Sequence, residues 1–221
     1  MTGQALLLAA ATALMASSVQ ADCKTHPLLD PTTCGVVKAP ASFSVTWSIT
    51  AAGKPANISV QVERAWAPLG VDRFYNLARL NYFDGTTETG NAAGFFRVVP
   101  NFVTQFGISG APPVSAAWQN LEIKDDPVIL SNVRGTISYA TAGPGTRTTQ
   151  VYINLANNSG LDAQGFTPFG KLSEEDMKTV DAINAQYGQS PDQDQIYAKG
   201  DAYLHANFPK LDYITNTYVT A

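Results

Sequence analysis

An arginine and a glutamine stand eight residues apart in a stretch that is otherwise mostly aromatic and β-branched. Arg97 lies between two phenylalanines and two valines, and Gln105 lies between Thr104 and Phe106. Because burying an unpaired charge is costly, a guanidinium in such a strand-like stretch is expected at the mouth of a cleft, where it meets polar groups. There it would act as a fixed cation that donates hydrogen bonds. The alternative is an edge strand in which Arg97 is merely solvated, and this stretch alone leaves both interpretations open.

Other kinds of catalytic site are poorly supported. A Ser-His-Asp triad would need one of only two histidines, His26 or His205, in a core cleft. The acidic cluster 174–176 falls in the first turn of a predicted helix, where solvated carboxylates stabilise the helix end. The Gly-rich run 141–146 lacks the Gly-Lys-Ser/Thr ending of a phosphate-binding loop.

Alternation of apolar and polar residues predicts two half-buried strands at 43–49 and 58–63, joined as a hairpin by the turn 52–55. From Pro68 the apolar residues fall on one helical face instead. This change of period predicts a helix of about three turns.

Further short strands are predicted around Arg97, at 135–140 and at 150–154. A second helix is predicted after Ser173, which forms an approximate capping box with Asp176. Many short strands with two separated helices favour a mostly β barrel over a parallel α/β sheet.

The composition is that of a globular protein without a nucleic-acid partner. Its 221 residues suffice for one domain with extensions, and 45% hydrophobic with 14% charged residues excludes a mainly disordered chain. The net charge is -4 and no Lys/Arg cluster occurs, so the electrostatic footprint for nucleic acid or an anionic membrane is missing.

The first 21 residues are interpreted as a signal peptide. The segment 5–19 is apolar but too short to span a bilayer comfortably, and Val19-Gln20-Ala21 has the small outer residues of a cleavage site. We therefore expect a protein of the secretory pathway lumen or the exterior, with no membrane attachment after cleavage. An uncleaved anchor is the alternative, which the short length disfavours.

Two cysteines, Cys23 and Cys34, are predicted to form a disulfide in an oxidising compartment. Such a small loop would add at most about 3 kcal/mol of stability. Metal binding with His26 would leave too few ligands for a closed zinc site, so no metal is expected. Asn-x-Ser sequons at Asn57 and Asn157 are compatible with surface glycosylation.

Three segments in order resemble the cyclophilin family of peptidyl-prolyl isomerases. These are FFRVVPNFVTQ at 95–105, GTISYATAGPGTRTTQVYIN at 135–154 and LDAQGFTPFGK at 161–171, the last similar to bacterial-type members. The resemblance extends over residues 43–187. Three matching blocks at the family's spacing make a specific signal, whereas any one block alone would be weak.

The resemblance implies a closed eight-stranded antiparallel β-barrel capped by two α-helices. The resemblance marks an isomerase domain at 43–187, and the residue patterns around it predict the signal peptide, an N-terminal arm at 22–42 with the disulfide and a C-terminal extension at 188–221 that packs on the domain. It further implies a monomer that needs no cofactor and acts on proline-containing peptides or protein clients.

The implied activity is rotation about X-Pro bonds, which amide resonance slows with a barrier of about 18–20 kcal/mol. By resemblance, Arg97 would donate a hydrogen bond toward the prolyl nitrogen, which regains its lone pair in the twisted state. Gln105 would orient the arginine and hold substrate backbone, and Phe102 would lie beneath the proline ring.

The resemblance also implies a set of substrate-binding residues around these three. They form the apolar pocket, pair with substrate backbone or line the site as a further polar group: Val103, Ala140, Thr141, Gln150, Tyr152, Leu161 and Phe166. For any single apolar member, ordinary packing is the alternative role.

Two positions depart from the best-known family pattern. Phe96 replaces a histidine found beside the arginine in many members, and Gly160 replaces a tryptophan or another aromatic residue. The loss of an aromatic wall at Gly160 predicts weakened cyclosporin binding.

The sequence therefore predicts a secreted peptidyl-prolyl cis-trans isomerase that assists the folding of secreted proteins. The alternative is a proline-peptide binding module or chaperone with little turnover. Retention of Arg97 with Phe102 and Gln105 argues against that alternative, because a mere pocket would not need the cation. A β-sandwich adhesion domain would leave the three segments unexplained.

Overall fold

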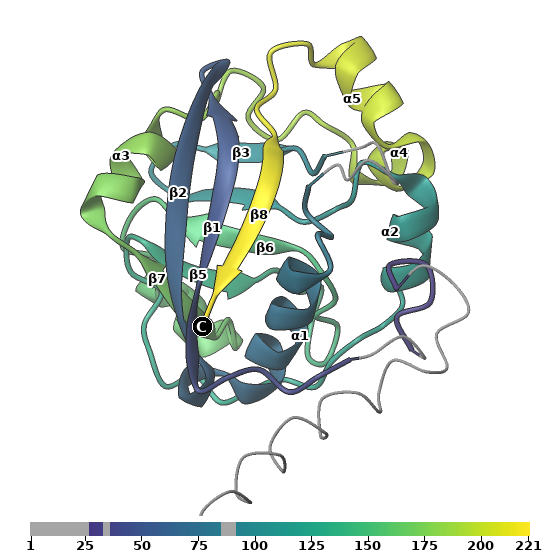
Figure 1. Cartoon of the computed structure of the whole chain (residues 1–221). Helices are drawn as coiled ribbons and strands as arrows, with labels where there is room; N and C mark the ends of the chain where they lie inside the picture. Colours follow the sequence, from purple (N-terminus) through teal and green to yellow (C-terminus); the bar gives the residue numbers. More distant parts are fainter. Residues whose placement is uncertain (1–26, 33–35, 85–91) are drawn as a thin grey trace, which may run out of the picture.

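A curled, eight-stranded antiparallel sheet dominates the structure, a computed structural model that describes residues 27–32, 36–84 and 92–221 (Figure 1). The strand order is β3-β4-β6-β5-β7-β2-β1-β8. The strands are β1 (Ser42–Ala51), β2 (Lys54–Glu63), β3 (Arg97–Val99), β4 (Val103–Phe106), β5 (Thr136–Tyr139), β6 (Val151–Asn154), β7 (Pro168–Leu172) and β8 (Ile214–Thr220). The helices are α1 (Pro68–Arg79), α2 (Pro112–Trp118), α3 (Glu174–Asp181), α4 (Gln193–Lys199) and α5 (Asp201–Asn207), with 3-10 turns η1 (Arg64–Trp66) and η2 (Ser159–Gln164).

The sheet is an open half-barrel, so the prediction of a closed barrel is wrong. Its edge strands β3 and β8 do not pair with each other within the described residues. The segment before β3 meets the start of β8 instead, through a bridge between Gly94 and Tyr213 and a hydrogen bond from the Ile214 N–H to the Ala93 carbonyl. A Cβ at position 94 would lie 2.7 Å from Leu211 Cδ2, so any larger residue there would have to displace that side chain. The described residues also hold five α-helices, whereas two were predicted.

The β1–β2 hairpin is confirmed. Ala51 pairs with Lys54, which leaves Ala52 and Gly53 as a two-residue turn with φ angles of 50° and 73°. The Asp212 carboxylate, just before β8, accepts the backbone N–H groups of both turn residues at 2.9 and 3.0 Å. The strained turn is thereby tied to the C-terminal part of the sheet.

Aromatic side chains fill the space that the curled sheet encloses. The Trp47 ring on β1 lies 5.3 Å from Phe106 on β4 and 5.8 Å from Phe74 on α1, centroid to centroid. These edge-on contacts join both halves of the sheet to α1. Helix α1 begins at Pro68, as predicted, and buries Val71, Phe74 and Leu77.

Helix α3 also matches its predicted start. The Ser173 side chain accepts the Asp176 N–H at 3.1 Å, and Met177 and Val180 are buried. The missed helices α2, α4 and α5 span only seven residues each, too short for a clear helical period.

Residues 188–221 provide α4, α5 and β8, and β8 pairs with β1 (Figure 1). A second hydrophobic cluster anchors this segment beside β3. It consists of the buried residues Phe96, Ile108, Ile196, Leu204 and Leu211.

The described part of the N-terminal arm packs on the helices. Trp118 Nε1 on α2 donates to the Leu28 carbonyl at 3.0 Å, and Val37 N–H donates to Asn76 on α1 at 3.0 Å. The proposed signal segment and the predicted Cys23–Cys34 disulfide lie outside the described residues. Within residues 27–32, 36–84 and 92–221, no helix is long and apolar enough to cross a membrane.

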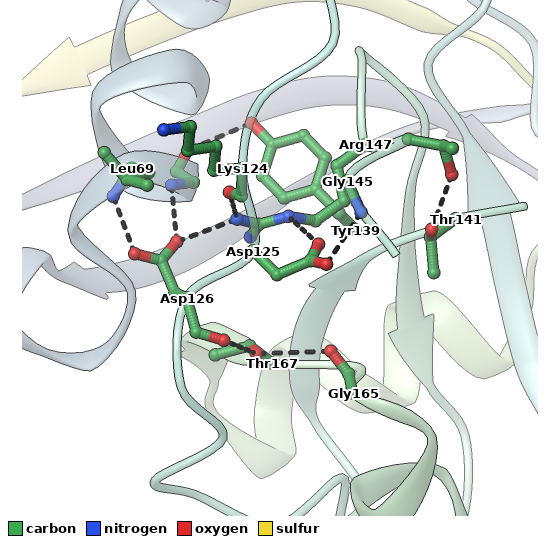
Figure 2. A network of polar contacts seen from close by, with 12 residues as sticks. Leu69, Lys124, Asp125, Asp126, Tyr139, Thr141, Gly145, Arg147, Gly165 and Thr167 are labelled. Atoms are coloured by element: carbon green, nitrogen blue, oxygen red, sulfur yellow. Dashed lines mark hydrogen bonds and ion pairs between the residues drawn. The ribbon is translucent and has the colours of Figure 1, made fainter. Parts of the chain in front are cut away.

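A buried ion pair joins α1 to the loop before β6 (Figure 2). Arg147 contacts Asp126 at 3.1 Å, with both side chains 3% exposed, and its guanidinium lies over the Tyr139 ring. Asp126 also accepts the first backbone N–H groups of α1, from Leu69 at 2.9 Å and Gly70 at 2.8 Å. Asp126 thus caps the helix and neutralises the arginine at once.

The same network extends into the loop itself. Arg147 contacts Asp125 at 3.3 Å, and Asp125 accepts the Gly145 N–H at 2.7 Å. Arg147 additionally donates to the Lys124 carbonyl. The residue patterns did not predict this role, although Arg147 is the one charged residue in 135–154. A single charge in an otherwise uncharged segment was the sequence feature that could have indicated a buried ion pair.

Replacing Arg147 by methionine should lower the free energy of unfolding by about 3–5 kcal/mol, because the Asp126 carboxylate would stay buried without its cation. Urea unfolding checks this. The matched control is Arg134→Met, which breaks the half-exposed pair with Asp181 and should cost at most about 1 kcal/mol. Equal losses in both variants would contradict a special role for the buried pair.

A second carboxyl is buried at the start of α5. Ala92 N–H donates to Asp201 Oδ2 at 3.1 Å, and Oδ1 has no hydrogen-bond partner within the described residues. Burial raises the pKa of the Asp201 carboxyl from 3.8 to about 6, against the opposing effect of His205.

Because the folded-state pKa lies above the unfolded value, the folded protein retains a proton that the unfolded chain releases. The resulting stabilisation is present below 3.8 and is lost as the pH rises to about 6. Asp201→Asn should therefore raise the melting temperature at about pH 8 more than at about pH 4. Thermal unfolding across this range tests it, and a gain independent of pH would refute the assignment.

Candidate active site

A pocket of about 310 Å³ opens on the part of the sheet formed by β4, β6 and their neighbouring loops. It brings together every predicted catalytic or substrate-binding residue except Gln150. It is lined by Arg97, Phe102, Val103, Gln105, Ala140, Thr141, Tyr152, Leu161, Gln164 and Phe166. Gln164, on η2, was not predicted.

Strand register sets the order of the polar groups. Arg97 on β3 pairs with Gln105 on β4, which in turn pairs with Tyr152 on β6. Directly paired residues in adjacent antiparallel strands point to the same face. The alternation of these short strands therefore aims the cation, the amide and the ring at one pocket.

Neutral amides hold the Arg97 guanidinium. Nη1 donates to Gln105 Oε1 at 3.1 Å, and Nε donates to Gln189 Oε1 at 3.3 Å. The Arg97 Cζ atom lies 5.5 Å from the centroid of the Phe102 ring. Arg97 forms no ion pair with a carboxylate in the described part of the chain, and Nη2 has no hydrogen-bond partner there. One N–H edge of the cation is thus left to serve a ligand.

The apolar part of the pocket is built from rings and aliphatic groups. Tyr152 lies edge-on to Phe166, with 5.9 Å between the centroids, and Val103 is buried beside them. Burial raises the pKa of the Tyr152 hydroxyl. It stays protonated and donates to Asn132 Oδ1 at 3.0 Å, on the side away from solvent.

Asn132 is a buried hub that the sequence analysis missed. Its Oδ1 also accepts from Ser138 at 2.8 Å, while its Nδ2 donates to Asp162 and to the Phe166 carbonyl, both at 2.8 Å. The hub therefore fixes the strand that carries Tyr152 and the turn that carries Phe166. No period or spacing marks a lone asparagine in a loop for such a role.

Asp162 supports this turn. Partial burial opposes its ionisation, but hydrogen bonds from Ser131 and Asn132 outweigh burial and lower the pKa of the carboxyl. An ionised Asp162 is the acceptor that these donors need. The carboxylate therefore has a structural part beside the pocket.

A second pocket of about 280 Å³ adjoins the first and shares Gln105, Ala140 and Thr141 with it. Gln150 lies here, together with Gln193 from α4. The Ala140 N–H already donates to the Gln150 carbonyl at 3.0 Å. Of the two backbone groups of Ala140, only the carbonyl is therefore left to hydrogen-bond a bound peptide.

The two departures from the family pattern lie in different surroundings. Phe96 is 2% exposed and packs in the second hydrophobic cluster, so it does not line the pocket. Gly160, on η2, is exposed, and a Cβ placed there would have no atom within 4 Å. The pocket thus has no aromatic wall at position 160.

Within the described residues, no group of three or more His, Cys, Asp or Glu side chains could hold a metal ion. The chemistry of the site rests on a cation, amides, rings and backbone groups.

Comparison with known proteins agrees with this geometry. Residues 46–200 match the family model described as cyclophilin type peptidyl-prolyl cis-trans isomerase/CLD. The chain is 32% identical over 135 residues to a peptidyl-prolyl cis-trans isomerase of Acinetobacter baylyi, which covers 58% of this chain and 66% of that protein. It is 33% identical over 122 residues to an isomerase of Schizosaccharomyces pombe, covering 52% of this chain and 71% of the other.

The fold is shared as well. A cyclophilin-type isomerase of Cryptosporidium parvum aligns with a TM-score of 0.57 at 16% identity, over 81% of this chain and 98% of that structure. The family match covers more than half of the chain and includes the arginine, the glutamine and every other residue of the pocket. The chain belongs to the cyclophilin-type peptidyl-prolyl cis-trans isomerase family.

Proposed function

We propose that this chain catalyses cis-trans isomerisation of X-Pro bonds in exposed peptide segments. The observation that carries the proposal is Arg97, held by neutral amides at the mouth of an apolar pocket with an unused N–H edge. Phe102, Val103 and Tyr152 offer the apolar surface for a proline ring, and the guanidinium stands beside it.

The reaction needs no covalent bond between the substrate and a side chain. Twisting the X-Pro amide breaks its resonance, and the prolyl nitrogen regains a lone pair that it lacks in the planar form. A donor aimed at that nitrogen binds the twisted state and hardly touches the planar one. Such differential binding is what lowers a barrier, and Arg97 is the donor available here.

The amide and backbone groups around the pocket support peptide alignment. Gln105 accepts a hydrogen bond from Arg97, and Ala140 and Thr141 border both pockets. An extended peptide lying along this edge would place its proline in the first pocket and the preceding residues toward the second.

Arg97→Ala should lower kcat/KM for a proline peptide by about 10²–10³-fold, because the donor to the twisted nitrogen is lost. Arg97→Lys should restore only part of the rate, since an ammonium lacks the planar fork with which the guanidinium binds two glutamines and still presents a fixed N–H edge to the substrate. A protease-coupled isomerisation assay measures both, with Arg134→Ala as the control arginine outside the site.

Equal rates for wild type and Arg97→Ala, with both proteins folded by circular dichroism, would refute the catalytic role. Peptide binding without acceleration by the wild type would instead support the binding-module alternative.

We further propose that the protein is secreted or resides in the secretory lumen, where it assists the folding of secreted proteins. The apolar segment 5–19, the small outer residues of 19–21 and the two cysteines predicted to pair support this. Asn57 and Asn157 are both exposed, as glycosylation would require. The bare Gly160 position supports weak cyclosporin binding.

Mass spectrometry of the protein exported by an expressing cell should find an N-terminus at Asp22. The mass of the unreduced protein should be lower than that of the reduced protein by the two thiol hydrogens of Cys23 and Cys34. Cys23→Ser is the control, because it should abolish that mass difference while cleavage continues. A mature protein that retains residues 1–21 would contradict the signal-peptide assignment.

A further inference from the structure

We propose that the loop before α4 and α4 itself hold the catalytic arginine in its working orientation, through Gln189, Gln193 and Tyr197. This rests on the proposed function and assigns positioning residues to it. The three side chains come from the segment after α3, outside the three blocks that resemble the family.

A chain of hydrogen bonds runs from Arg97 to α4. Arg97 Nη1 donates to Gln105 Oε1 at 3.1 Å, and Gln105 Nε2 donates to Gln150 Oε1 at 2.8 Å. Gln150 Nε2 then donates to two acceptors on α4, Gln193 Oε1 and the Tyr197 hydroxyl, each at 3.0 Å. Every link joins one donor to one acceptor in the same direction.

The cation fixes that direction. A guanidinium has only donors, so Gln105 must turn its oxygen toward Arg97 and its NH₂ group toward Gln150. Gln150 must in turn present its oxygen to Gln105 and its NH₂ group to α4. If either amide turned over, two donors would face each other. The acceptors on α4 therefore complete a chain whose other end is Arg97.

Gln189 supports the cation from a second direction. Its Oε1 accepts from Arg97 Nε at 3.3 Å, while Gln105 holds Nη1. Two acceptors on different nitrogens define the plane of the guanidinium. That plane decides where the remaining edge, Nη2, points.

The segment that supplies these groups is itself firmly attached. The Gly188 carbonyl accepts the Val98 N–H at 2.8 Å, next to Arg97 on β3. Ile196 is fully buried in the second hydrophobic cluster, and the Asp192 side chain accepts the Gln195 N–H at 3.1 Å as the N-cap of α4. Burial raises the pKa of the Tyr197 hydroxyl, so it remains neutral. The acceptors thus stand on a fixed element.

The test varies the hydrogen-bond acceptors that α4 presents to the Gln150 side chain. Gln193→Ala with Tyr197→Phe removes both acceptors but keeps the tyrosine ring. Gln193→Glu with Tyr197→Phe keeps one acceptor, and Gln193→Lys with Tyr197→Phe presents a donor instead. Gln195→Ala is the control on the same helix, two residues from Gln193 and hence on another face.

We expect kcat to fall about 2- to 10-fold when both acceptors are lost, with KM for a proline peptide nearly unchanged, because the lost orientation matters in the twisted state. The lysine variant should lose at least as much, and the glutamate variant should recover most of the rate. Gln189→Ala, tested alone, should lower kcat in the same range. Wild-type kcat in any two of these acceptor-deficient variants would overturn the proposal, as would equal rates for the glutamate and lysine variants.

A second readout does not depend on activity. The ¹⁵N relaxation of Arg97 Nε should report greater motion in the acceptor-free variant than in wild type or Gln195→Ala, at an unchanged melting temperature. If the wild-type protein shows no isomerase activity, the proposed function fails, and this measurement still decides the positioning role. Unchanged Arg97 motion would refute it.

If the Gln193→Ala/Tyr197→Phe variant unfolds, the test rests on Gln189→Ala and on the comparison of the glutamate and lysine variants at position 193.

Discussion

The polar arrangement of the pocket depends on one constraint: the Arg97 guanidinium is held in place by neutral groups, without a carboxylate partner in the described residues. A carboxylate beside Arg97 would fix the side chain, but it would also take the hydrogen-bond donors that the proposed function assigns to a substrate nitrogen. Gln105 and Gln189 solve this by accepting from Nη1 and Nε as neutral groups. Amide acceptors bind more weakly than carboxylates, so several must act together, and their own donors must in turn find acceptors. The polar groups around the pocket follow from that requirement.

Arg147 shows the opposite solution to the same problem. It is buried, forms ion pairs with Asp125 and Asp126, and lies over Tyr139, so its charge is neutralised within the protein. Its task is to tie the loop before β6 to the N-terminus of α1 through Asp126. Arg147 is thus a structural link, whereas Arg97, which is partly exposed, keeps an N–H edge without a protein partner in the described residues; the two differ in burial and in partners. Residue type alone cannot distinguish them.

This contrast explains how far the sequence could predict the protein. The β1–β2 hairpin, α1 and α3 follow from local patterns and were found, and the family resemblance located nearly the whole pocket. The open sheet edge was missed because closure depends on how β3 and β8 diverge, which no local period records. Asn132 and Gln193 were missed because each acts through partners distant in the sequence, such as Tyr152 and Gln150. Short helices such as α4 carry too few turns to show a face.

The open edge and the proposed positioning role have a common physical basis. β3 is an edge strand of three residues, and unpaired edge groups invite pairing with other chains. Here the Gly188 carbonyl accepts a hydrogen bond from the Val98 N–H of β3. The second hydrophobic cluster, which includes Ile196, packs around Phe96, the residue just before β3. A segment recruited to cover the edge inevitably lies beside Arg97, the first residue of that strand. Protection of the edge therefore places polar side chains of the C-terminal segment within reach of Arg97, the cation to which the proposed function assigns catalysis.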